Sequence, residues 1–223
     1  MPAKKTFLII TLARNEESTI TNILKKSLEY GDVLLINDAS VDNTLKLAKK
    51  LPVTIISNVV SKGYSNCKRL GLIYAIKKNY QKIILIDSDG EHSPDLIKKF
   101  IQNFKNPINI IFGKRKINRF SEKIICKYYK IIYGVSDILC GMIALKTSKI
   151  KKELLFSSKD DLGMEIILDI LRNKNKFTEI NVFGKERIKN SRIYVNFYSK
   201  FKYLKIIFSS ISNDILFILK KWL

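Results

Sequence analysis

The chain has 223 residues, of which 46% are hydrophobic, and it carries a formal net charge of +21. This length and apolar content exclude a disordered chain and fit one sizeable α/β domain with at most an appendage. The charge favours an anionic partner, such as a phosphorylated molecule, nucleic acid or anionic lipid, although a generally Lys- and Ile-rich composition also explains part of the excess. Three cysteines without a C-x-x-C pair favour a reducing, cytoplasmic setting.

Short apolar runs rich in Ile and Val predict five strands buried on both faces. They cover residues 6–12, 32–37, 53–57, 82–87 and 108–113. Segments with helical periodicity lie near 16–30, 42–51, 63–79, 94–105 and 119–133. Strands that alternate with helices at this spacing predict an α/β fold with a doubly wound, mostly parallel sheet flanked by helices. Because the alternation weakens after about residue 113, we expect the second half to form a different layer of the same domain.

The end of the chain differs from the rest, so we divide it into a domain over 1–195 and an amphipathic helical tail over 196–223. Apolar residues from Leu204 to Trp222 recur at three- and four-residue steps, with lysines elsewhere. The longest run without a charge, between Lys205 and Asp214, is far shorter than the roughly 18 residues that cross a bilayer. The tail is therefore expected to lie on a membrane, to dock as an ordinary helix, or to join copies in a homo-oligomer.

The stretch LIDSDGEHSPD, residues 85–95, places several acidic side chains at the end of the fourth expected strand. Alternate side chains of an extended chain face the same way, so Asp87 and Asp89 should converge. In doubly wound folds this is the edge of the sheet where ligands bind. Two convergent carboxylates favour a hard cation, Mg²⁺ or Mn²⁺, with Glu91 as an outer third ligand. His92 is expected to be a solvated or capping residue.

Polar loops follow each of the first four expected strands. Their sequences are ARNEE (13–17), INDASVDNT (36–44), NVVSKGYSNCKRLGL (58–72) and DSDGEHSP (87–94). In order and spacing they resemble the inverting family 2 glycosyltransferases of GT-A fold, and most of all the polyprenyl-phosphate (dolichyl-phosphate mannose or glucose) synthases. The resemblance implies a metal-dependent enzyme that moves a hexose from a nucleotide sugar, of GDP-mannose or UDP-glucose type, to a polyprenyl phosphate.

For the donor, the resemblance implies roles for residues in these loops. Glu16 and Asp38 match positions that hold the nucleoside of the sugar donor. Lys62 and Gly63 match a loop near the donor, where a lysine and a helix N-terminus suit a diphosphate. Asp87 and Asp89 match the metal-binding D-x-D pair, which makes Asp87 a donor-binding and Asp89 a catalytic residue as well.

For the acceptor, the resemblance is looser. Arg115 matches a family arginine after the fifth strand, and Arg119 is a further cationic candidate; both are expected to be catalytic and acceptor-binding. Arg187 and Ser191 fall where relatives place an arginine and a serine near the lipid phosphate. Glu165 and Glu179 match a spaced pair of family glutamates, but they are equally well explained as solvated surface residues. The family pattern is broken at a few positions, which are Arg14, Asn37, Cys140, Ile143 and Asn190.

The kind of acceptor follows from the charge around the fifth strand. A hydroxyl acceptor needs a carboxylate base, whereas a phosphate monoester is mostly dianionic at neutral pH and needs cations instead. Between Lys114 and Lys130, seven basic residues face one acid, Glu122. We therefore expect a polyprenyl phosphate acceptor and a peripheral protein on the cytoplasmic face of an anionic membrane. The alternative is a sugar hydroxyl acceptor, as in polysaccharide synthesis, with Asp160, Asp161 or Glu165 as the base.

Three other classes of protein fit less well. A nucleic-acid-binding protein is disfavoured because the basic residues lack a recognisable motif and the acidic loops would repel a phosphate backbone, so no nucleic acid partner is expected. A nucleotidyltransferase should have a glycine-rich loop after its first strand, and TLARNEEST contains no glycine. A catalytically inactive binding protein is the third alternative.

Overall fold

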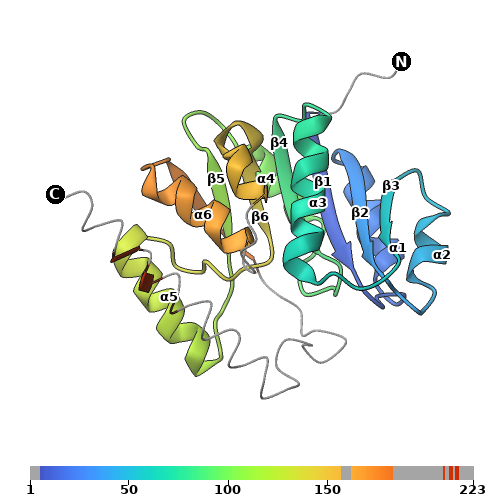
Figure 1. Ribbon diagram of the computed structural model, residues 1–223, viewed down its shortest axis with the longest axis horizontal. Helices are drawn as coiled ribbons and strands as arrows, with labels where there is room; N and C mark the ends of the chain where they lie inside the picture. The colour runs from blue at the N-terminus through green and yellow to red at the C-terminus, as the bar shows by residue number, and fades with distance from the viewer. Residues whose placement is uncertain (1–5, 157–161, 183–207, 209–210, 213, 216–223) are drawn as a thin grey trace.

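A seven-stranded sheet, with strand order β3-β2-β1-β4-β6-β5-β7, forms the centre of the computed structural model (Figure 1). The structure describes residues 6–156, 162–182, 208, 211–212 and 214–215. The strands are β1 (Phe7–Ala13), β2 (Asp32–Asp38), β3 (Thr54–Asn58), β4 (Lys82–Asp87), β5 (Ile110–Lys114), β6 (Ile143–Lys146) and β7 (Phe177–Asn181). β1 pairs in parallel with β2 on one side and with β4 on the other, so the strand order reverses at β1.

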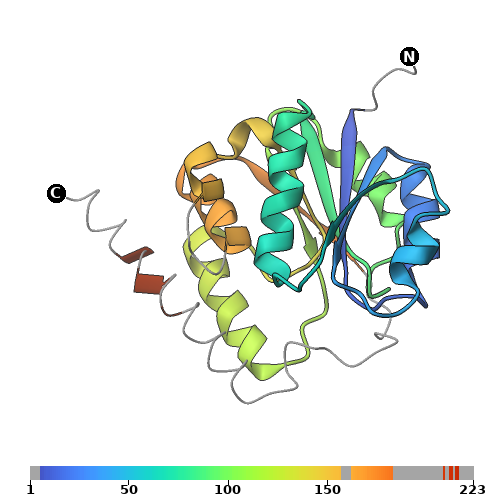
Figure 2. The same cartoon turned by 45° about the vertical axis from the view of Figure 1, so that its right-hand side comes forward.

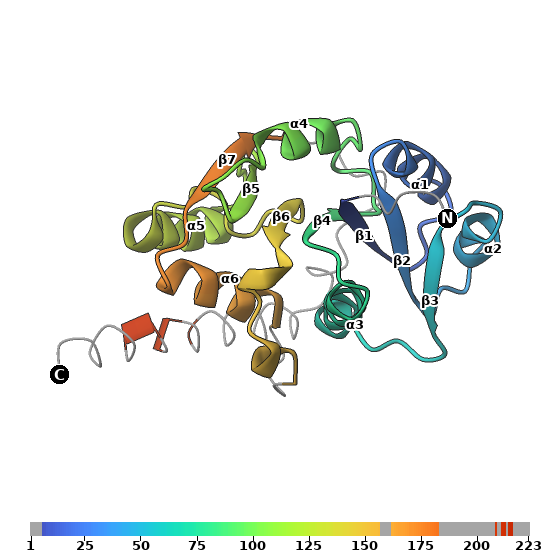
Figure 3. The same cartoon turned by 90° about the horizontal axis from the view of Figure 1, so that it is seen from above.

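Helices cover both faces of this sheet (Figures 2 and 3). They are α1 (Ile20–Leu28), α2 (Thr44–Ala48), α3 (Tyr64–Lys77), α4 (Leu96–Asn103), α5 (Phe120–Tyr133) and α6 (Leu162–Arg172), with short 3₁₀ turns η1 (Thr147–Lys149) and η2 (Lys152–Phe156). Residues of α3, α5 and α6 share one apolar cluster. Residues of α1, α2 and α4 share the other.

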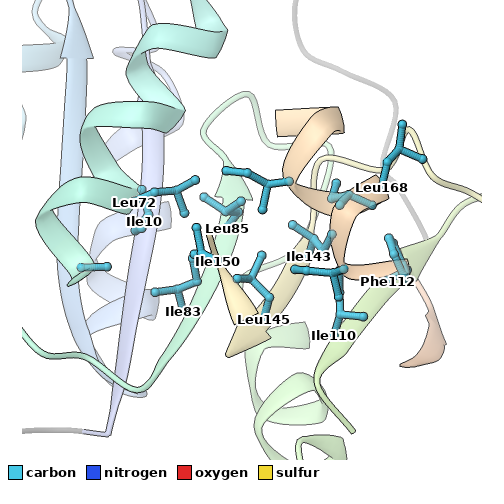
Figure 4. Packing of buried hydrophobic residues seen from close by; sticks show 14 of the residues in the cluster. Ile10, Leu72, Ile83, Leu85, Ile110, Phe112, Ile143, Leu145, Ile150 and Leu168 are labelled. Atoms are coloured by element: carbon cyan, nitrogen blue, oxygen red, sulfur yellow. The ribbon is translucent and has the colours of Figure 1, made fainter. Parts of the chain in front are cut away.

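The central strands are buried on both sides because successive side chains enter opposite clusters. In β1, Leu8 and Ile10 face the α3 side, whereas Phe7 and Ile9 face the α1 side. Figure 4 shows Ile10 beside Leu72 of α3 on the first of these faces. This packing explains why β1, β2 and β4 read as continuous apolar runs, and it confirms the expected doubly wound, mostly parallel fold. The expectation of burial on both faces is wrong for β3, which is the edge strand and has no buried residue.

The expectation of a separate layer for the second half of the chain is wrong. β6 lies between β4 and β5 and is antiparallel to both, and β7 extends the same sheet in parallel with β5 (Figure 3). β6 and β7 have only four and five residues, so neither gives the longer apolar run that marks the central strands. The second half therefore completes the sheet.

The described residues of the C-terminal segment dock against the domain. Ile211 packs against the apolar cluster on the α3 side. The carboxylate of Asp214 is fully buried, accepts a hydrogen bond from the Tyr133 hydroxyl at 3.0 Å, and pairs with the Arg172 guanidinium. These contacts favour the docked alternative for this part of the tail. The boundary at residue 195 lies outside the described residues and stays a prediction.

A helix that crosses a bilayer needs about 18 or more mostly apolar residues. Within the part of the chain that the structure describes, no helix is both long enough and apolar enough to cross a membrane.

Candidate active site

The site lies at the carboxyl ends of β1, β2, β3 and β4, where the loops after these parallel strands meet. A reversal of strand order leaves a crevice at this edge because the connections on either side run to opposite faces of the sheet. Asp38 is the last residue of β2 and Asp87 the last residue of β4, and β1 separates these two strands. The fold thus brings together acidic residues that are far apart in the sequence.

The loops after β1 and β2 are held together by hydrogen bonds. The backbone N–H of Asn15 donates to Ser40 Oγ at 3.0 Å, and the N–H of Val41 donates to Asn15 Oδ1 at 2.8 Å. The N–H of Glu16 donates to Thr44 Oγ1 at 2.8 Å. The backbone at Glu16, one of the expected nucleoside-binding residues, is therefore fixed to the start of α2.

Asp38 organises the loop that precedes α3. Its Oδ1 accepts from Asn58 Nδ2 at 2.9 Å and from the N–H of Lys62 at 2.8 Å, while Oδ2 accepts from Ser61 Oγ at 2.7 Å and from the N–H of Gly63 at 3.1 Å. Burial opposes ionisation of this carboxyl, but the hydrogen bonds outweigh burial and lower its pKa to about 2. Gly63 has φ of 82°, a conformation that favours glycine. The geometry shows Asp38 as a loop anchor, whereas its direct contact with a nucleoside stays a prediction.

Asp87 is confined between α3 and the segment that leads into β6. Its Oδ1 accepts a hydrogen bond from the Tyr64 hydroxyl at 3.0 Å. Desolvation of the hydroxyl and the nearby Asp87 charge raise the pKa of Tyr64 well above its ordinary value, although 46% of the residue is exposed, so the phenol remains a donor at neutral pH. A Cβ at Gly141 would lie 1.8 Å from Asp87 Oδ2, so the carboxylate fits there only because residue 141 has no side chain. Tyr64 is not among the residues expected from the sequence, although its place just after Gly63 is a usable signal.

Asp89 and Glu91 share one turn but have different partners. Asp89 Oδ1 accepts the backbone N–H of Glu91 at 3.0 Å, in a turn where Gly90 has φ of 80°. The Glu91 carboxylate points to Arg115, with Oε1 3.3 Å from Nη1. Among the described residues, no group of three or more His, Cys, Asp and Glu side chains is placed to hold a metal ion. In this conformation Glu91 pairs with an arginine, and the expected metal-binding roles of Asp87, Asp89 and Glu91 stay predictions.

Arg115 is the centre of a buried ionic cluster. Its Nε lies 2.9 Å from Oδ2 of Asp137, a fully buried carboxylate, and its own side chain is 16% exposed. Glu122 also lies within 3.8 Å of Arg115 and pairs with Arg119 at 3.1 Å. Burial lowers the pKa of the Arg115 guanidinium, but its bonds to Asp137 outweigh this effect and raise the pKa above its ordinary value. Arg115 is thus bound by carboxylates and joins the turn at residues 89–91, here called the acidic turn, to α5. Its role in binding the acceptor stays a prediction.

His92 is not solvated, contrary to the sequence-based expectation. It is fully buried, and its Nε2 lies 3.7 Å from the Cys140 sulfur. Burial raises the pKa of the Cys140 thiol, which therefore remains protonated at neutral pH. This contact joins the acidic turn to the segment that contains Gly141.

The remaining expected residues fall into two groups. Glu165 lies 3.7 Å from Arg172, and Glu179 accepts the backbone N–H of Ser136 at 2.6 Å, so both glutamates have structural partners. Arg187 and Ser191, expected near an acceptor phosphate, lie outside the described residues, as do Asp160 and Asp161. Their expected roles therefore stay predictions.

Replacing Asp38 with Asn should remove an acid-sensitive part of the stability. The folded-state pKa is about 2 against an ordinary value of 3.8. The stabilisation is therefore present above about pH 4 and is lost as the pH falls toward 2, by roughly 2 kcal/mol. Denaturant unfolding across this range should show this loss in the parent and in the exposed control Asp95→Asn, but not in Asp38→Asn. An equal loss in all three proteins would contradict the role of Asp38.

Replacing Asp137 with Asn should destabilise the fold by about 3 kcal/mol, because the buried Arg115 charge loses its main partner. Asp169→Asn is a matched control, since Asp169 pairs with Lys151, whose side chain is 55% exposed. The control should cost less than about 1 kcal/mol. The measurement is the free energy of unfolding in denaturant, and similar small costs for both variants would refute the structural importance of the Arg115 cluster.

Comparisons with known proteins agree with this architecture. Residues 8–154 match the family model described as Glycosyl transferase family 2. The chain is 29% identical over 215 residues to the UDP-N-acetylglucosamine--dolichyl-phosphate N-acetylglucosaminyltransferase of Methanococcus voltae, covering 81% of this chain and 86% of that protein. It is 26% identical over 179 residues to the dolichol-phosphate mannosyltransferase of Pyrococcus furiosus, covering 73% of this chain and 49% of that protein.

A solved structure shows the same fold. Glucosyl-3-phosphoglycerate synthase from Mycobacterium tuberculosis, crystallised with Mn²⁺, UDP-glucose and phosphoglyceric acid, superposes with a TM-score of 0.73 at 15% identity, covering 93% of this chain and 80% of that one. The family match runs from Leu8 in β1 through β6 and includes all four loops at the carboxyl edge of the sheet. The chain therefore belongs to glycosyl transferase family 2 and has the GT-A fold.

Proposed function

We propose that this protein transfers a hexose or a related sugar from a nucleoside-diphosphate sugar to a polyprenyl phosphate, in one inverting step. A phosphate oxygen of the acceptor attacks the anomeric carbon, and the bond from that carbon to the donor diphosphate breaks. The nucleoside diphosphate leaves with the electron pair of that bond. The observation that carries the proposal is that Asp87, at the end of β4, and Asp38, which ends β2 and anchors the loop before α3, lie at one edge of the sheet, with Asp89 two residues after Asp87.

The donor side follows from the loops at this edge. Asp38 holds the backbone of Lys62 and Gly63 at the start of α3, where helix N–H groups and a lysine favour a diphosphate. Glu16 is held beside α2 by Thr44. We infer that the nucleoside lies between these two loops, with its diphosphate directed toward Asp87 and Asp89. In this arrangement Asp38 acts through the loop that it anchors.

The residues present fit a divalent cation. Asp87 and Asp89 are hard oxygen donors, and the space left by Gly141 allows the Asp87 carboxylate to stand at the end of β4. Two protein carboxylates leave several positions of a Mg²⁺ or Mn²⁺ shell for water and donor phosphate oxygens, which is the usual arrangement for nucleotide-bound ions. When bound, the ion would supply Lewis-acid neutralisation of the charge that develops on the leaving diphosphate. Tyr64 would keep the Asp87 carboxylate oriented toward it.

The acceptor side rests on electrostatics and on the relatives. A polyprenyl phosphate brings its own anionic nucleophile, so no carboxylate base is needed. Of the carboxylates considered as bases for a hydroxyl acceptor, the described one, Glu165, pairs with Arg172 in α6. Two relatives are named for transfer to dolichyl or dolichol phosphate. The alternative, a sugar hydroxyl acceptor, is separated by the experiment below.

Purified protein should form a labelled glycolipid from a polyprenyl phosphate and one member of a panel of UDP- and GDP-sugars. A chelator should abolish the product, and Asp89→Asn should lower the rate at least about 100-fold because the leaving group loses its charge stabilisation. The exposed Asp95→Asn variant in the same segment should retain the parent rate. Transfer to a soluble oligosaccharide, with none to polyprenyl phosphate, would overturn the acceptor assignment and leave the family assignment intact.

Tyr64→Phe should weaken metal binding about 10-fold, because the first aspartate loses the hydroxyl that orients it. Binding of Mn²⁺ in the presence of nucleoside diphosphate can be measured by calorimetry, without turnover. Tyr74→Phe, on the same helix, serves as the control and should bind Mn²⁺ like the parent. If Tyr64→Phe binds Mn²⁺ unchanged, the hydroxyl does not support the metal site.

A further inference from the structure

One side of α5 exposes large apolar side chains to solvent. Phe120 is 78% exposed, Ile124 57% and Ile131 73%. With about 100° of rotation per residue, these three side chains leave the helix within roughly 40° of one another. They form an apolar strip along one side of the helix, with the exposed Lys127 between Ile124 and Ile131.

The opposite side of α5 already has its own apolar contacts. Ile125, Cys126 and Tyr129 are buried there, and Tyr129 is among the largest fully buried side chains of the described core. The exposed strip is therefore additional to the surface that attaches α5 to the domain. Packing within the described part of the chain does not account for it, which is typical of a surface that contacts something else.

The charges beside the strip all have one sign. Lys123, Lys127 and Lys130 are exposed, and at helical spacing they lie next to the apolar strip. The sequence of α5 contains one acidic residue, Glu122, which is buried and pairs with Arg119 and Arg115. We call the set Phe120, Lys123, Ile124, Lys127, Lys130 and Ile131 the open face of α5.

We propose that the open face of α5 docks on the surface of an anionic lipid bilayer, with the helix axis parallel to the membrane. Apolar side chains mixed with lysines suit this boundary, because the rings and branched chains enter the acyl region while the ammonium groups reach the phosphates. A protein partner that covered the same face would need carboxylates spaced to meet three lysines, whereas an anionic bilayer meets them at any spacing. The fit is therefore to a lipid surface.

This docking would bring the membrane to the active site in a defined orientation. α5 begins at Phe120, directly after Arg119, whose partner Glu122 also contacts Arg115. Arg115 in turn lies 3.3 Å from Glu91 in the acidic turn. The N-terminal end of the open face is thus the end connected to Asp87 and Asp89. A lipid phosphate at that end would meet Arg119 before it reached the donor.

Co-sedimentation with vesicles tests the proposal without donor, acceptor or turnover. The full chain should bind vesicles of phosphatidylcholine with phosphatidylglycerol at physiological salt and should bind pure phosphatidylcholine much more weakly. The triple variant Lys123→Gln, Lys127→Gln, Lys130→Gln should lose about fivefold in binding per lysine. Ile124→Ser with Ile131→Ser should weaken binding at least about 10-fold, because the apolar strip is lost.

Matched controls come from the opposite end of the molecule, where α2 lies far from α5 (Figures 1 and 3). The exposed triple Lys46→Gln, Lys49→Gln, Lys50→Gln removes the same charge, and Val41→Ser removes an apolar side chain that is 90% exposed. Both should bind vesicles like the parent, and unfolding curves should show all variants folded. Equal losses in the α2 and α5 triples would reduce the effect to net charge and overturn the proposal.

The proposal deepens the proposed function and rests on it only for the identity of the acceptor, so the two can fail separately. Vesicle binding that depends on the open face, without transfer to polyprenyl phosphate, would refute the acceptor and keep the membrane surface. Transfer to a detergent-dispersed polyprenyl phosphate, without vesicle binding, would refute the membrane surface and keep the acceptor. A dimer in solution that Ile124→Ser dissociates, with no vesicle binding, would assign the face to a second copy and overturn the proposal.

Discussion

The buried pair between Arg115 and Asp137 is the contact on which the rest of the site depends. A guanidinium can be buried only where carboxylates satisfy it, and here those carboxylates come from three separate parts of the chain. Asp137 lies four residues before Gly141, Glu91 belongs to the acidic turn after β4, and Glu122 belongs to α5. The Arg115 side chain therefore holds three elements in fixed positions relative to one another. They are the turn that contains Glu91, the segment that leads from Asp137 to Gly141, and α5. The net basic charge of the chain conceals a centre in which arginines are outnumbered by acids.

Asp38 and Asp87 show how neighbours give the same side chain different tasks. Four hydrogen-bond donors surround Asp38, which keeps it ionised at neutral pH, and these bonds hold the loop before α3 and the end of β3. Asp87 receives one phenolic hydroxyl and otherwise faces a backbone without a side chain. The Asp38 carboxylate therefore stabilises a loop, whereas the proposed role of the Asp87 carboxylate is to bind a metal ion. The strand β1 lies between them, so both environments occur at the same edge of the sheet.

The sequence predicts the central strands well, because their burial follows from local patterns. The runs around Ile9, Leu35 and Ile84 require burial on both faces, and the first aspartate of the D-x-D stretch, Asp87, is the last residue of β4 as the end of the apolar run predicts. Long-range partners have no such local signal. The pairing of Glu91 with Arg115, the burial of His92 against Cys140 and the insertion of β6 all depend on segments many residues away. Charge and polarity alone predicted a solvated His92, and the buried position of this residue depends on contacts that no local pattern shows.

The absence of a side chain at residue 141 has a consequence for how the chain tolerates change. Gly63 and Gly90 have positive φ, so their replacement would strain the backbone itself. Gly141 is not among the positive-φ glycines of the described chain, and what forbids a larger residue there is the Asp87 carboxylate. A single added methyl group would compete with that carboxylate for the same space while leaving backbone torsions at ease. A substitution of Gly141 would therefore displace the Asp87 carboxylate and impair activity before it destabilised the fold. A variant without activity could in this way remain a well-folded protein.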